Sequence, residues 1–534
     1  MRPFDKDGIF HPTDDALALR RRAVRGAGIT VFSAGAGLSV QIVATVVLAR
    51  LLTPNDFGLV TMVTTFSLLL INFGWNGFTE AVIQRETIDR FMVSNLFWIN
   101  AGAGALLTIG FASAGSLLAR FYGDARVAHV SVAISITIFI QTLSVQHLAL
   151  LKRAMLFSFT SANDIVSRFV SVMVSILLAW AGWGYWALVA GNVAQTLSTC
   201  VGAWWLCRWI PSLPRPAAGT AAMVRFAIST YGRFIANYCT WNLDNLLVGW
   251  RFGPVSLGFY KKAFDLFALS ASQLVAPLTS VAVSALSRLN RTSTEFRRSL
   301  LGALEITAFV GMAVGADLTL IGKDVIRVLL GPKWDESGSI FMFFGPGIGV
   351  MLLYYTHGWI HLSIGRADRW LRWGLVEFAT TATLFLLALH WGPIGIAMAW
   401  TASYWILTLP SLWYAGRPIN LGIGPVVAIV WRYVVASWLA GGLAEVIIHR
   451  LPSSVAAPSV VAAVVRIAAI SVMFGVLYVG AAILLHGGFA PLVQLSRLVR
   501  ELLPHRSSSK SFSAGAVNLS LRSSTPAASS ADPL

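Results

Sequence analysis

The stretch PNDFGLVTMVTTFSLLLINFGWNG, residues 54–77, decides the fold of this chain. Its apolar part, residues 57–77, carries no charged side chain and is long enough to cross a bilayer as a helix. Similar spans of roughly 20 residues recur about fourteen times, and little polar sequence separates them. The sequence therefore predicts an all-α membrane protein with about fourteen transmembrane helices.

The composition agrees with a membrane protein. Of 534 residues, 56% are hydrophobic and only 12% are charged, whereas about 25% of residues are charged in soluble proteins. The net charge is +17. Because Lys and Arg collect in the cytoplasmic loops of membrane proteins, this excess does not indicate a nucleic-acid partner. Cys200, Cys207 and Cys239 follow neither a disulfide nor a metal-site spacing.

The distribution of basic residues predicts the topology. The N-terminal segment ends in the basic run Arg20–Arg22 and Arg25, and a full-length span follows it instead of a cleavable signal peptide. This start favours a cytoplasmic N-terminus. If the spans cross the membrane alternately from a cytoplasmic N-terminus, most Lys and Arg lie on the cytoplasmic side. An even number of spans then returns the C-terminus to that side. We expect both termini to be cytoplasmic.

Three pairs of loop motifs indicate an internal duplication. PNDFGL at 54–59 matches PVSLGF at 254–259, and LLARFYGD, ending at Asp124, matches VIRVLLGP, ending at Pro332. Trp183-Gly184 likewise matches Trp391-Gly392. One match could arise by chance because loops favour Pro and Gly. All three pairs occur in the same order, and the two members of each pair are separated by nearly the same number of residues. This regularity predicts two six-helix lobes with parallel topology and two further helices outside the repeat.

These spans divide the chain into consecutive segments. The predicted order is a basic N-terminus (1–25), an N-lobe (26–207), a cytoplasmic linker with three prolines (208–225), a C-lobe (226–414), two additional spans (415–490) and a Ser-, Ala- and Pro-rich disordered tail (491–534).

The sequence offers almost no catalytic signature. GADLTLIGKD at 315–324 resembles a P-loop but has the wrong glycine spacing and Asp324 in place of Ser or Thr. His357 and His361 stand four residues apart without the Glu of a zinc protease motif, so polar packing between helices explains them better. No outer loop is long enough for a polymerase or ligase domain. We expect a transporter that is not an enzyme and has neither cofactor nor metal site.

Charged residues inside the spans are the best site candidates, because such residues are costly in a bilayer and usually face a bundle interior or a watery cavity. Arg233, Asn237, Thr240, Trp241 and Asp244 share one helix face in the seventh span, and Arg251 extends that line. This face predicts the border of a hydrated cleft. The alternative is that the arginines snorkel to the interfaces and Asp244 bonds to a neighbouring helix.

The eighth span begins with a second charged group. Lys261 and Lys262 are followed one turn later by Asp265, and Lys261 can pair with Asp265 at the i, i+4 spacing. Interface anchoring of both lysines is the alternative interpretation. In the first half of the chain, Asp164 and Arg168 can form a similar pair. Uncharged candidates for a lumen are Gln41, Gln141, Gln146, Asn192 and Gln195, for which hydrogen bonding between helices is the alternative.

Cations that face a lumen suit an anionic ligand. A phosphate or diphosphate offers several acceptor oxygens, which Arg grips in a bidentate manner. The charge pattern therefore favours a phosphorylated lipid headgroup over a cationic drug.

The chain resembles the polysaccharide transporter (Wzx-type) flippase family, exopolysaccharide branch, within the multidrug/oligosaccharidyl-lipid/polysaccharide exporter superfamily. The resemblance covers about residues 26–490. The segments that carry it are ARLLTPNDFGLV, NLDNLLVGWRFGPVSLGFYKKAFDL, SALSRLN and VIRVLLGPKWDESG.

This resemblance implies a bacterial inner-membrane flippase that moves undecaprenyl-diphosphate-linked oligosaccharide units by alternating access. The resemblance implies a cationic cavity but no fixed site residues. We expect Arg233, Lys261 and Lys262 to contact the diphosphate there, with Arg251 near the outer mouth and Asn237 and Trp241 beside them. Asp244 and Asp265 would tune these cations or bind a coupling ion, H⁺ or Na⁺. The expected partners are the polyprenyl-linked sugar, membrane lipids, and a polysaccharide polymerase and co-polymerase.

Two other functional classes stay open at this point. The first is a cation-coupled multidrug antiporter of the same superfamily, which would favour acidic residues in its lumen. The second is a non-transporting enzyme or assembly component of the polysaccharide synthesis complex.

Overall fold

The computed structural model describes residues 3–5, 8–10, 16–85, 87–217, 219–289, 294–450 and 460–489. In this part of the chain the regular structure is helical, with one isolated bridge between Ile9 and Asp89. The α-helices are Ala16–Leu51 (α1), Pro54–Phe73 (α2), Glu80–Gln84 (α3), Arg90–Tyr122 (α4), Arg126–Arg153 (α5), Phe157–Trp180 (α6), Tyr185–Cys207 (α7), Thr220–Leu286 (α8), Thr294–Leu330 (α9), Asp335–Ser363 (α10), Ala367–Ala388 (α11), Gly392–Gly416 (α12), Ile423–His449 (α13) and Val460–His486 (α14). Short π- or 3₁₀-helical turns are Gly74–Thr79 (η1), Pro332–Trp334 (η2), Leu389–Trp391 (η3) and Arg417–Ile419 (η4).

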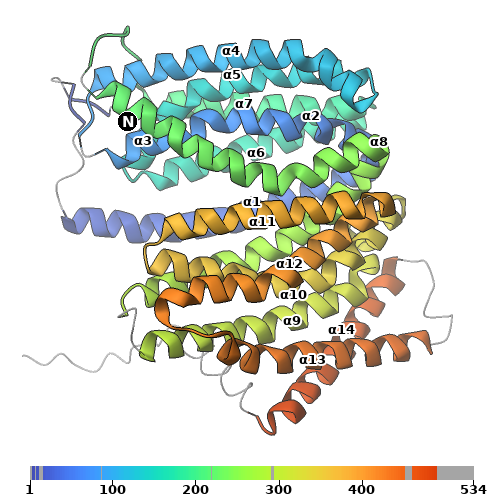
Figure 1. The fold of residues 1–534 in the computed structure, drawn as a ribbon. Coiled ribbons are helices and arrows are strands. Elements are labelled where there is room, and N and C mark those ends of the chain that lie inside the picture. The colour runs from blue at the N-terminus through green and yellow to red at the C-terminus, as the bar shows by residue number, and fades with distance from the viewer. Residues whose placement is uncertain are drawn as a thin grey trace, which may run out of the picture. The chain divides into compact units, whose positions relative to one another are not determined.

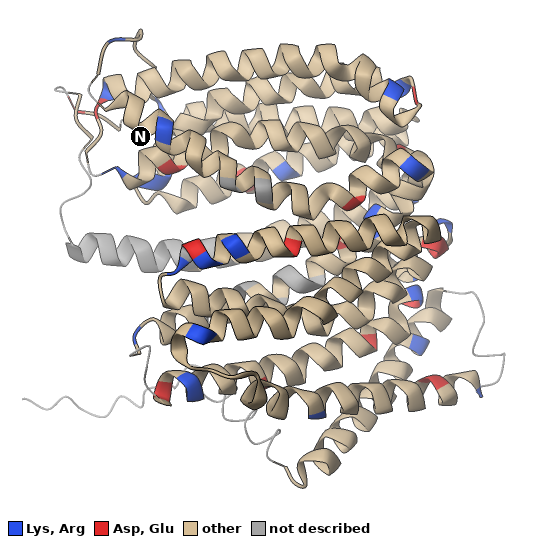
Figure 2. Ribbon diagram, in the orientation of Figure 1, with Lys and Arg blue, Asp and Glu red and all other residues tan. Residues whose placement is uncertain are grey.

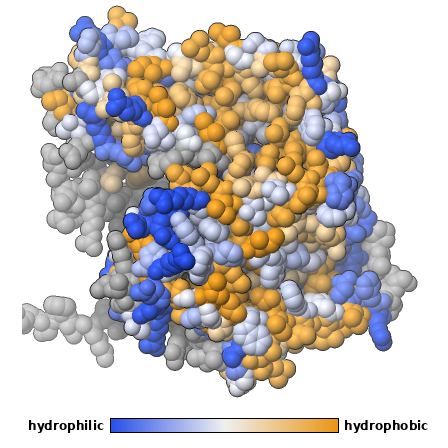
Figure 3. Space-filling view, viewed as in Figure 1, coloured by the Kyte–Doolittle hydropathy of each residue, from blue (hydrophilic) through white to orange (hydrophobic). Residues whose placement is uncertain are grey.

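The predicted all-α membrane class is confirmed. Within the described residues, 10 helical segments are long and apolar enough to cross a membrane. Lys and Arg lie mainly toward the ends of the helices (Figure 2), and hydrophobic side chains cover much of the visible face (Figure 3). The protein is therefore a multi-pass membrane protein, whereas the count of fourteen spans and the division into lobes stay predictions.

Local sequence explains where several helices begin and end. Thr53 caps α2 by accepting a hydrogen bond from the backbone N–H of Asp56, and the Asp56 carboxylate accepts one from the backbone N–H of Thr53. This reciprocal arrangement is a capping box, and Pro54 suits the first helical position because its missing N–H is not needed there. The α4 helix is capped by Asp89 and ends at Gly123, whose φ of 70° favours glycine.

The helices pack both on neighbours in sequence and on helices far along the chain, as α2 does on α8. Contacts divide the chain into a large unit, Met1–Gly488, and a second unit, Phe489–Leu534, of which only Phe489 is described. In the large unit, α4 packs on α5, α6 on α7, and α9 on α10 (Figure 1). The C-terminal pair α13 and α14 packs on α9. The predicted tail, 491–534, lies outside the described residues.

Helix α8 contains two of the predicted spans in one bent helix. Its backbone is non-helical at Gly253, where φ is 79° and ψ is −178°. Such a φ is easily reached only by glycine, which has no Cβ to clash. The chain therefore changes direction at Gly253, and the sequence PVSLGF begins the second half of α8 directly after it.

PNDFGL and PVSLGF, the first pair of motifs from which the duplication was predicted, cross each other at this point. Packing between α2 and α8 brings Gly58 against the backbone of Pro254, and Gly258 against the backbone of Pro54. A Cβ on Gly58 would stand 1.7 Å from the Pro254 carbonyl oxygen, and a Cβ on Gly258 would stand 1.9 Å from that of Pro54. Only glycine permits so close an approach of the two backbones. We call this contact the glycine crossing.

A tryptophan from a third motif lies beside the crossing. The indole N–H of Trp334, in η2, donates a 2.9 Å hydrogen bond to the carbonyl of Ala49 near the end of α1. The ring of Trp334 lies 5.5 Å from the ring of Phe57 and 6.0 Å from that of Phe259, and the residue is completely buried. Three of the four segments that carry the family resemblance thus meet in one place.

Candidate functional site

The structure brings Lys261, Lys262 and Asp265 together on α8. Nζ of Lys261 lies 2.7 Å from the Asp265 carboxylate, as the i, i+4 spacing predicted, and Nζ of Lys262 lies 3.8 Å from it. The Lys262 side chain is only 10% exposed, and its Nζ stands 4.0 Å from the centre of the Phe57 ring. Lys262 therefore lies at the glycine crossing, where an ion pair and an aromatic face hold its charge.

Asp244 occupies a different environment on the same helix. Its carboxylate is completely buried and accepts hydrogen bonds from the Tyr260 hydroxyl at 2.7 Å, the Trp400 indole N–H at 3.0 Å and the backbone N–H of Asn245 at 2.7 Å. These donors satisfy the carboxylate and tie the first half of α8 to its second half and to α12. This geometry agrees with the alternative interpretation, in which Asp244 bonds to neighbouring segments.

Asn237 and Trp241 line a cavity between α8 and α11. The cavity has a volume of about 520 Å³, and Trp370 and Glu377 of α11 contribute to its wall. The Trp241 ring is stacked on Tyr355, with the ring centres 6.3 Å apart. Neither lysine of α8 belongs to the lining, so the residues predicted on this helix divide between separate environments.

The two arginines predicted on α8 lie apart from these groups. Arg251 is exposed beside the Gly253 bend, and its guanidinium lies 5.9 Å from the Phe252 ring. Arg233 lies in the first half of α8, but its side chain is outside the described residues.

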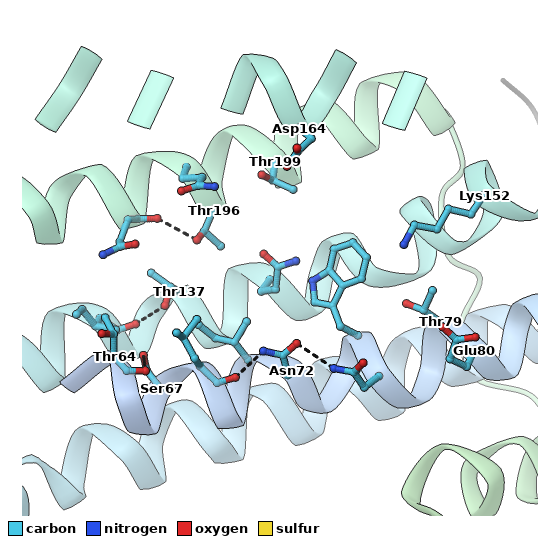
Figure 4. Close-up of a pocket in the computed structure, with 18 residues that line it drawn as sticks. Thr64, Ser67, Asn72, Thr79, Glu80, Thr137, Lys152, Asp164, Thr196 and Thr199 are labelled. Atoms are coloured by element: carbon cyan, nitrogen blue, oxygen red, sulfur yellow. Dashed lines mark hydrogen bonds between the residues drawn. The ribbon is translucent and has the colours of Figure 1, made fainter. Parts of the chain in front are cut away.

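A more polar cavity lies within the N-terminal half of the molecule. It has a volume of about 450 Å³ and is lined by residues of α2, η1, α3, α5, α6 and α7. Its polar lining residues are Thr64, Ser67, Asn72, Asn76, Thr79, Glu80, Thr137, Gln141, Lys152, Asp164, Asn192, Gln195, Thr196 and Thr199. Figure 4 shows these side chains pointing from several helices into a shared space. We call it the N-lobe cavity.

The lining combines amide and hydroxyl groups with few charges. The side-chain N–H of Asn76 donates a 3.0 Å hydrogen bond to the Asn72 side-chain oxygen, which orients both amides (Figure 4). Among the uncharged residues predicted to face a lumen, Gln141, Asn192 and Gln195 line this cavity, whereas Gln41 and Gln146 are not among its lining residues. Neutral hydrogen-bonding groups of this kind suit a ligand rich in hydroxyls.

A π-helical turn shapes one end of the cavity. Trp75, Asn76 and Thr79 belong to η1, which interrupts the regular helical backbone between α2 and α3. Such π-turns are rare and are frequent at functional sites. The turn begins at Gly74, where a Cβ would stand 2.9 Å from the Asn100 side-chain oxygen, so close packing against α4 also constrains it.

Lys152 is the cation of this cavity. Its Nζ lies 4.5 Å from the centre of the Trp75 ring, and Figure 4 shows its side chain reaching from α5 toward Thr79. No Asp or Glu in the described parts of the chain lies within ion-pair distance of it. The sequence analysis missed Lys152 because a lysine at the end of a span, beside Arg153, looks like an interface anchor. Its contact with Trp75, which lies on a different helical segment, leaves no signal in the sequence.

Asp164 borders the same cavity but is paired. Its carboxylate lies 2.9 Å from Nε of Arg168, as predicted from their spacing. Glu80 is the second acid of the lining and belongs to the short helix α3. The cavity therefore presents one cation and two carboxylates, one of which Arg168 balances.

Comparison with known proteins gives the family. The family described as "Polysaccharide biosynthesis protein" matches residues 47–339. Among curated proteins, the succinoglycan biosynthesis transport protein ExoT of Rhizobium meliloti (strain 1021) is 22% identical over 381 residues, covering 71% of this chain and 77% of the relative. The teichuronic acid biosynthesis protein TuaB of Bacillus subtilis (strain 168) is 24% identical over 388 residues, covering 70% of this chain and 80% of the relative. The lipopolysaccharide biosynthesis protein WzxC of Escherichia coli (strain K12) is 21% identical over 327 residues, covering 60% and 65%.

Solved structures agree on the fold. The lipid II flippase MurJ, in an inward closed conformation, superposes with a TM-score of 0.68 at 13% identity, covering 90% of this chain and 99% of that one. An inward-facing multidrug resistance MATE family transporter of the MOP superfamily gives a TM-score of 0.58 at 13% identity, covering 71% and 94%. At these identities the likeness establishes the fold alone.

The sequence motifs and the comparisons point to one assignment. The matched family covers more than half of the chain, and it includes the segments with which the glycine crossing is built. The chain belongs to the polysaccharide biosynthesis protein family, which confirms the predicted membership of the Wzx-type polysaccharide transporters.

Proposed function

We propose that this protein is a flippase of the bacterial inner membrane that translocates undecaprenyl-diphosphate-linked oligosaccharide units for exopolysaccharide or lipopolysaccharide biosynthesis. The observation that carries the proposal is a polar cavity inside a membrane domain of this family. The named roles of two relatives, a succinoglycan transport protein and a lipopolysaccharide biosynthesis protein, support the same class.

The N-lobe cavity fits the sugar portion of such a substrate. Sugar hydroxyls both donate and accept hydrogen bonds, and the amides of Asn72, Gln141 and Gln195 do the same. The face of Trp75 offers an apolar surface on which the C–H groups of a sugar ring can pack. Within a bilayer such a lining would be costly unless water or a polar ligand satisfied it.

The cations of α8 fit the diphosphate portion. Lys261 is 28% exposed and Arg251 is exposed, so both remain accessible to an anionic headgroup. Lys262 contributes charge close to the glycine crossing. We infer that these residues, with Arg233, attract the diphosphate, and that Asn237 and Trp241 act beside them. The prenyl tail would stay in the lipid, next to α13 and α14.

Alternating access requires a contact between the halves that forms and breaks. On the predicted topology, the glycine crossing lies at the outer end of the bundle, so a conformation with this contact intact is closed outward. Two further features stay predictions. One is a coupling ion, H⁺ or Na⁺, bound at Asp244 or Asp265. The other is association with a polymerase and co-polymerase. The cytoplasmic placement of both termini and the inner-membrane location also stay predictions.

The test is direct reconstitution. Purified protein in liposomes should flip a fluorescent undecaprenyl-diphosphate oligosaccharide, and Lys152→Gln or Asn72→Ala should slow that step. Lys333→Gln, at an exposed lysine of η2, is the matched control and should keep the parent rate. Deletion of the gene should abolish surface polymer and accumulate lipid-linked repeats. Absence of flipping by folded protein, together with normal surface polymer in the deletion strain, would overturn the proposal.

A multidrug antiporter is the second candidate, because Glu80 and Asp164 line the same cavity and acidic residues suit cationic drugs. In that case the deletion strain would keep its polymer and become sensitive to cationic drugs. Glu80→Gln would then abolish drug efflux, whereas a flippase would lose polymer export on Lys152→Gln instead.

A further inference from the structure

The segment between α7 and α8 is fastened along the start of α4. The Asn95 side-chain N–H donates to the backbone carbonyl of Arg215 at 2.6 Å, and its side-chain oxygen accepts from the backbone N–H of Arg215 at 3.1 Å. The Ser94 hydroxyl oxygen accepts a 3.0 Å hydrogen bond from the backbone N–H of Ser212, and the Trp98 indole N–H donates a 2.9 Å hydrogen bond to the Ser212 carbonyl. These bonds from one helix face fix a proline-rich segment that has no helical structure of its own.

A groove with an apolar wall opens beside this fastened segment. It has a volume of about 1000 Å³, and its wall includes Trp98 and Ile99 of α4 and Val224 and Ile228 of α8. Trp98, Ile99 and Ile228 are 43%, 40% and 57% exposed. The segment also carries Ile210 and Leu213, which are 73% and 75% exposed, so this end of the bundle presents apolar side chains outside its packed interior.

Arginines gather at the same groove. Arg215 and Arg225 line it, and Asn95 holds the backbone of Arg215 in place at its rim. The guanidinium of a third arginine, Arg85, lies against Gly219, where a Cβ would stand 2.2 Å from it. Gly219 separates two lining residues of the groove, Ala217 and Thr220.

Ion pairs within the described part of the chain do not balance the charge at this corner. Among the described residues, no Asp or Glu forms an ion pair with Arg85, Arg215 or Arg225. The buried Nε of Arg85 has no hydrogen-bond partner there. Helix α8 begins at Thr220 with no side-chain cap, and the partial positive charge of a helix N-terminus adds to that of the arginines. An anion at this corner would relieve the repulsion and supply acceptors.

We propose that this groove binds an anionic phospholipid, whose phosphate lies between Arg215 and Arg225 and whose acyl chain lies along Trp98, Ile99, Val224 and Ile228. The occupant follows from two features that occur together: an apolar wall at the end of membrane-spanning helices and unbalanced arginines at its rim. A soluble anion would use the arginines but leave the wall exposed, and a neutral lipid would use the wall but leave the arginines unpaired. The site is separate from the N-lobe cavity and does not depend on the proposed flipping activity.

The consequence of occupancy concerns the segment that joins the two predicted lobes. A lipid that contacts both Trp98 of α4 and Ile228 of α8 connects the N-terminal helices to the start of the next set. The bound lipid would therefore hold this segment against α4, in addition to the bonds made by Ser94 and Asn95. Lipid composition would then affect how easily the connection is released.

Lipid binding to the full-length purified protein tests this inference. Native mass spectrometry with phosphatidylglycerol and phosphatidylcholine should show preferential binding of phosphatidylglycerol. Each of Arg215→Gln and Arg225→Gln should weaken that binding about fivefold, the effect of one cation near an anionic surface, and the double variant roughly 20-fold. Arg208→Gln removes an exposed arginine from the same segment, outside the groove, and should leave binding unchanged.

Three further outcomes would overturn the proposal. The first is equal loss of phosphatidylglycerol in Arg208→Gln and in the double variant, which would mean general surface attraction. The second is displacement of the bound phospholipid by undecaprenyl diphosphate at equal concentration, which would assign the groove to the transported lipid. The third is unchanged quenching by brominated phosphatidylglycerol when Trp98→Phe is compared with the parent, since the acyl chain would then lie elsewhere. Thermal unfolding of every variant confirms that it is folded.

Discussion

Substitution of the glycines at the crossing of α2 and α8 should separate these helices. In Gly58→Ala, the new Cβ would stand 1.7 Å from the carbonyl oxygen of Pro254, whereas real Cβ contacts essentially never fall below 3.0 Å. The Pro254 carbonyl belongs to the backbone and cannot rotate away as a side chain could, so the helices must move apart by more than 1 Å. Overpacking of this kind costs about 1–3 kcal/mol.

The reciprocal substitution should have a similar effect. In Gly258→Ala the Cβ would stand 1.9 Å from the carbonyl oxygen of Pro54. Because both substitutions open the same contact, their effects on stability should not add in the double variant. Gly110→Ala in α4 is the matched control, since a Cβ there meets nothing within 4 Å. Replacing that helical glycine should stabilise the protein by about 0.4–1 kcal/mol.

Thermal unfolding in detergent and flipping in liposomes measure the two consequences. Gly58→Ala and Gly258→Ala should lower Tm, while Gly110→Ala should keep or raise it. The crossing variants should also flip at least about tenfold more slowly, the rate equivalent of about 1.4 kcal/mol, because the outward-closed conformation is destabilised. Parent-like Tm and flipping in both crossing variants would refute the reasoning, since the close backbone approach would then be absent in the membrane.

Three further predictions concern charged groups. Asp244→Ala should destabilise the protein by about 2–4 kcal/mol in denaturation experiments, because it leaves the buried Tyr260 hydroxyl and Trp400 indole N–H without an acceptor. Asp244→Asn keeps one acceptor oxygen and should destabilise the protein less. Lys152→Arg should retain more export of surface polymer than Lys152→Gln if charge matters at the N-lobe cavity, and equal export in both would contradict that role. The hydrogen bond from the Arg126 side chain holds the pKa of the Asp124 carboxyl below its usual value. The stabilisation of the folded protein by this pair is therefore complete above the unfolded pKa of about 3.9 and is lost as pH falls through the lower folded pKa. In Asp124→Asn, a plot of Tm against pH should fall less steeply at acidic pH.

The helices could be predicted because their signal is local. Hydrophobic length alone identifies a span such as residues 57–77, and capping groups such as Thr53 mark its start. The bend at Gly253 and the π-turn η1 were not predicted, since both depend on what packs against them. The Gly253 bend appears in the sequence only as a glycine before a proline, a pattern that also occurs in ordinary loops.

The site was harder to predict because its residues come from different helices. Periodicity predicted Asp244 on a polar face of one helix, but it could not show that Tyr260 and Trp400 satisfy its carboxylate. Lys152 was missed for the opposite reason. Its partner Trp75 lies on η1, and nothing in the spacing along α5 predicts that contact. One-dimensional patterns identify polar faces, whereas the three-dimensional packing decides which faces enclose a cavity.

The glycine crossing links the duplication to the proposed mechanism. Two copies of one motif that contact each other reciprocally, Gly58 on Pro254 and Gly258 on Pro54, form the internal equivalent of an interface between two identical subunits. In such an interface a single sequence feature is used twice, so one glycine in the ancestral repeat would have supplied both halves of the contact. The contact itself is made by backbone atoms, and the buried rings of Phe57 and Trp334 pack beside it. A contact that is close and symmetric suits a closure that must form and break in every transport cycle.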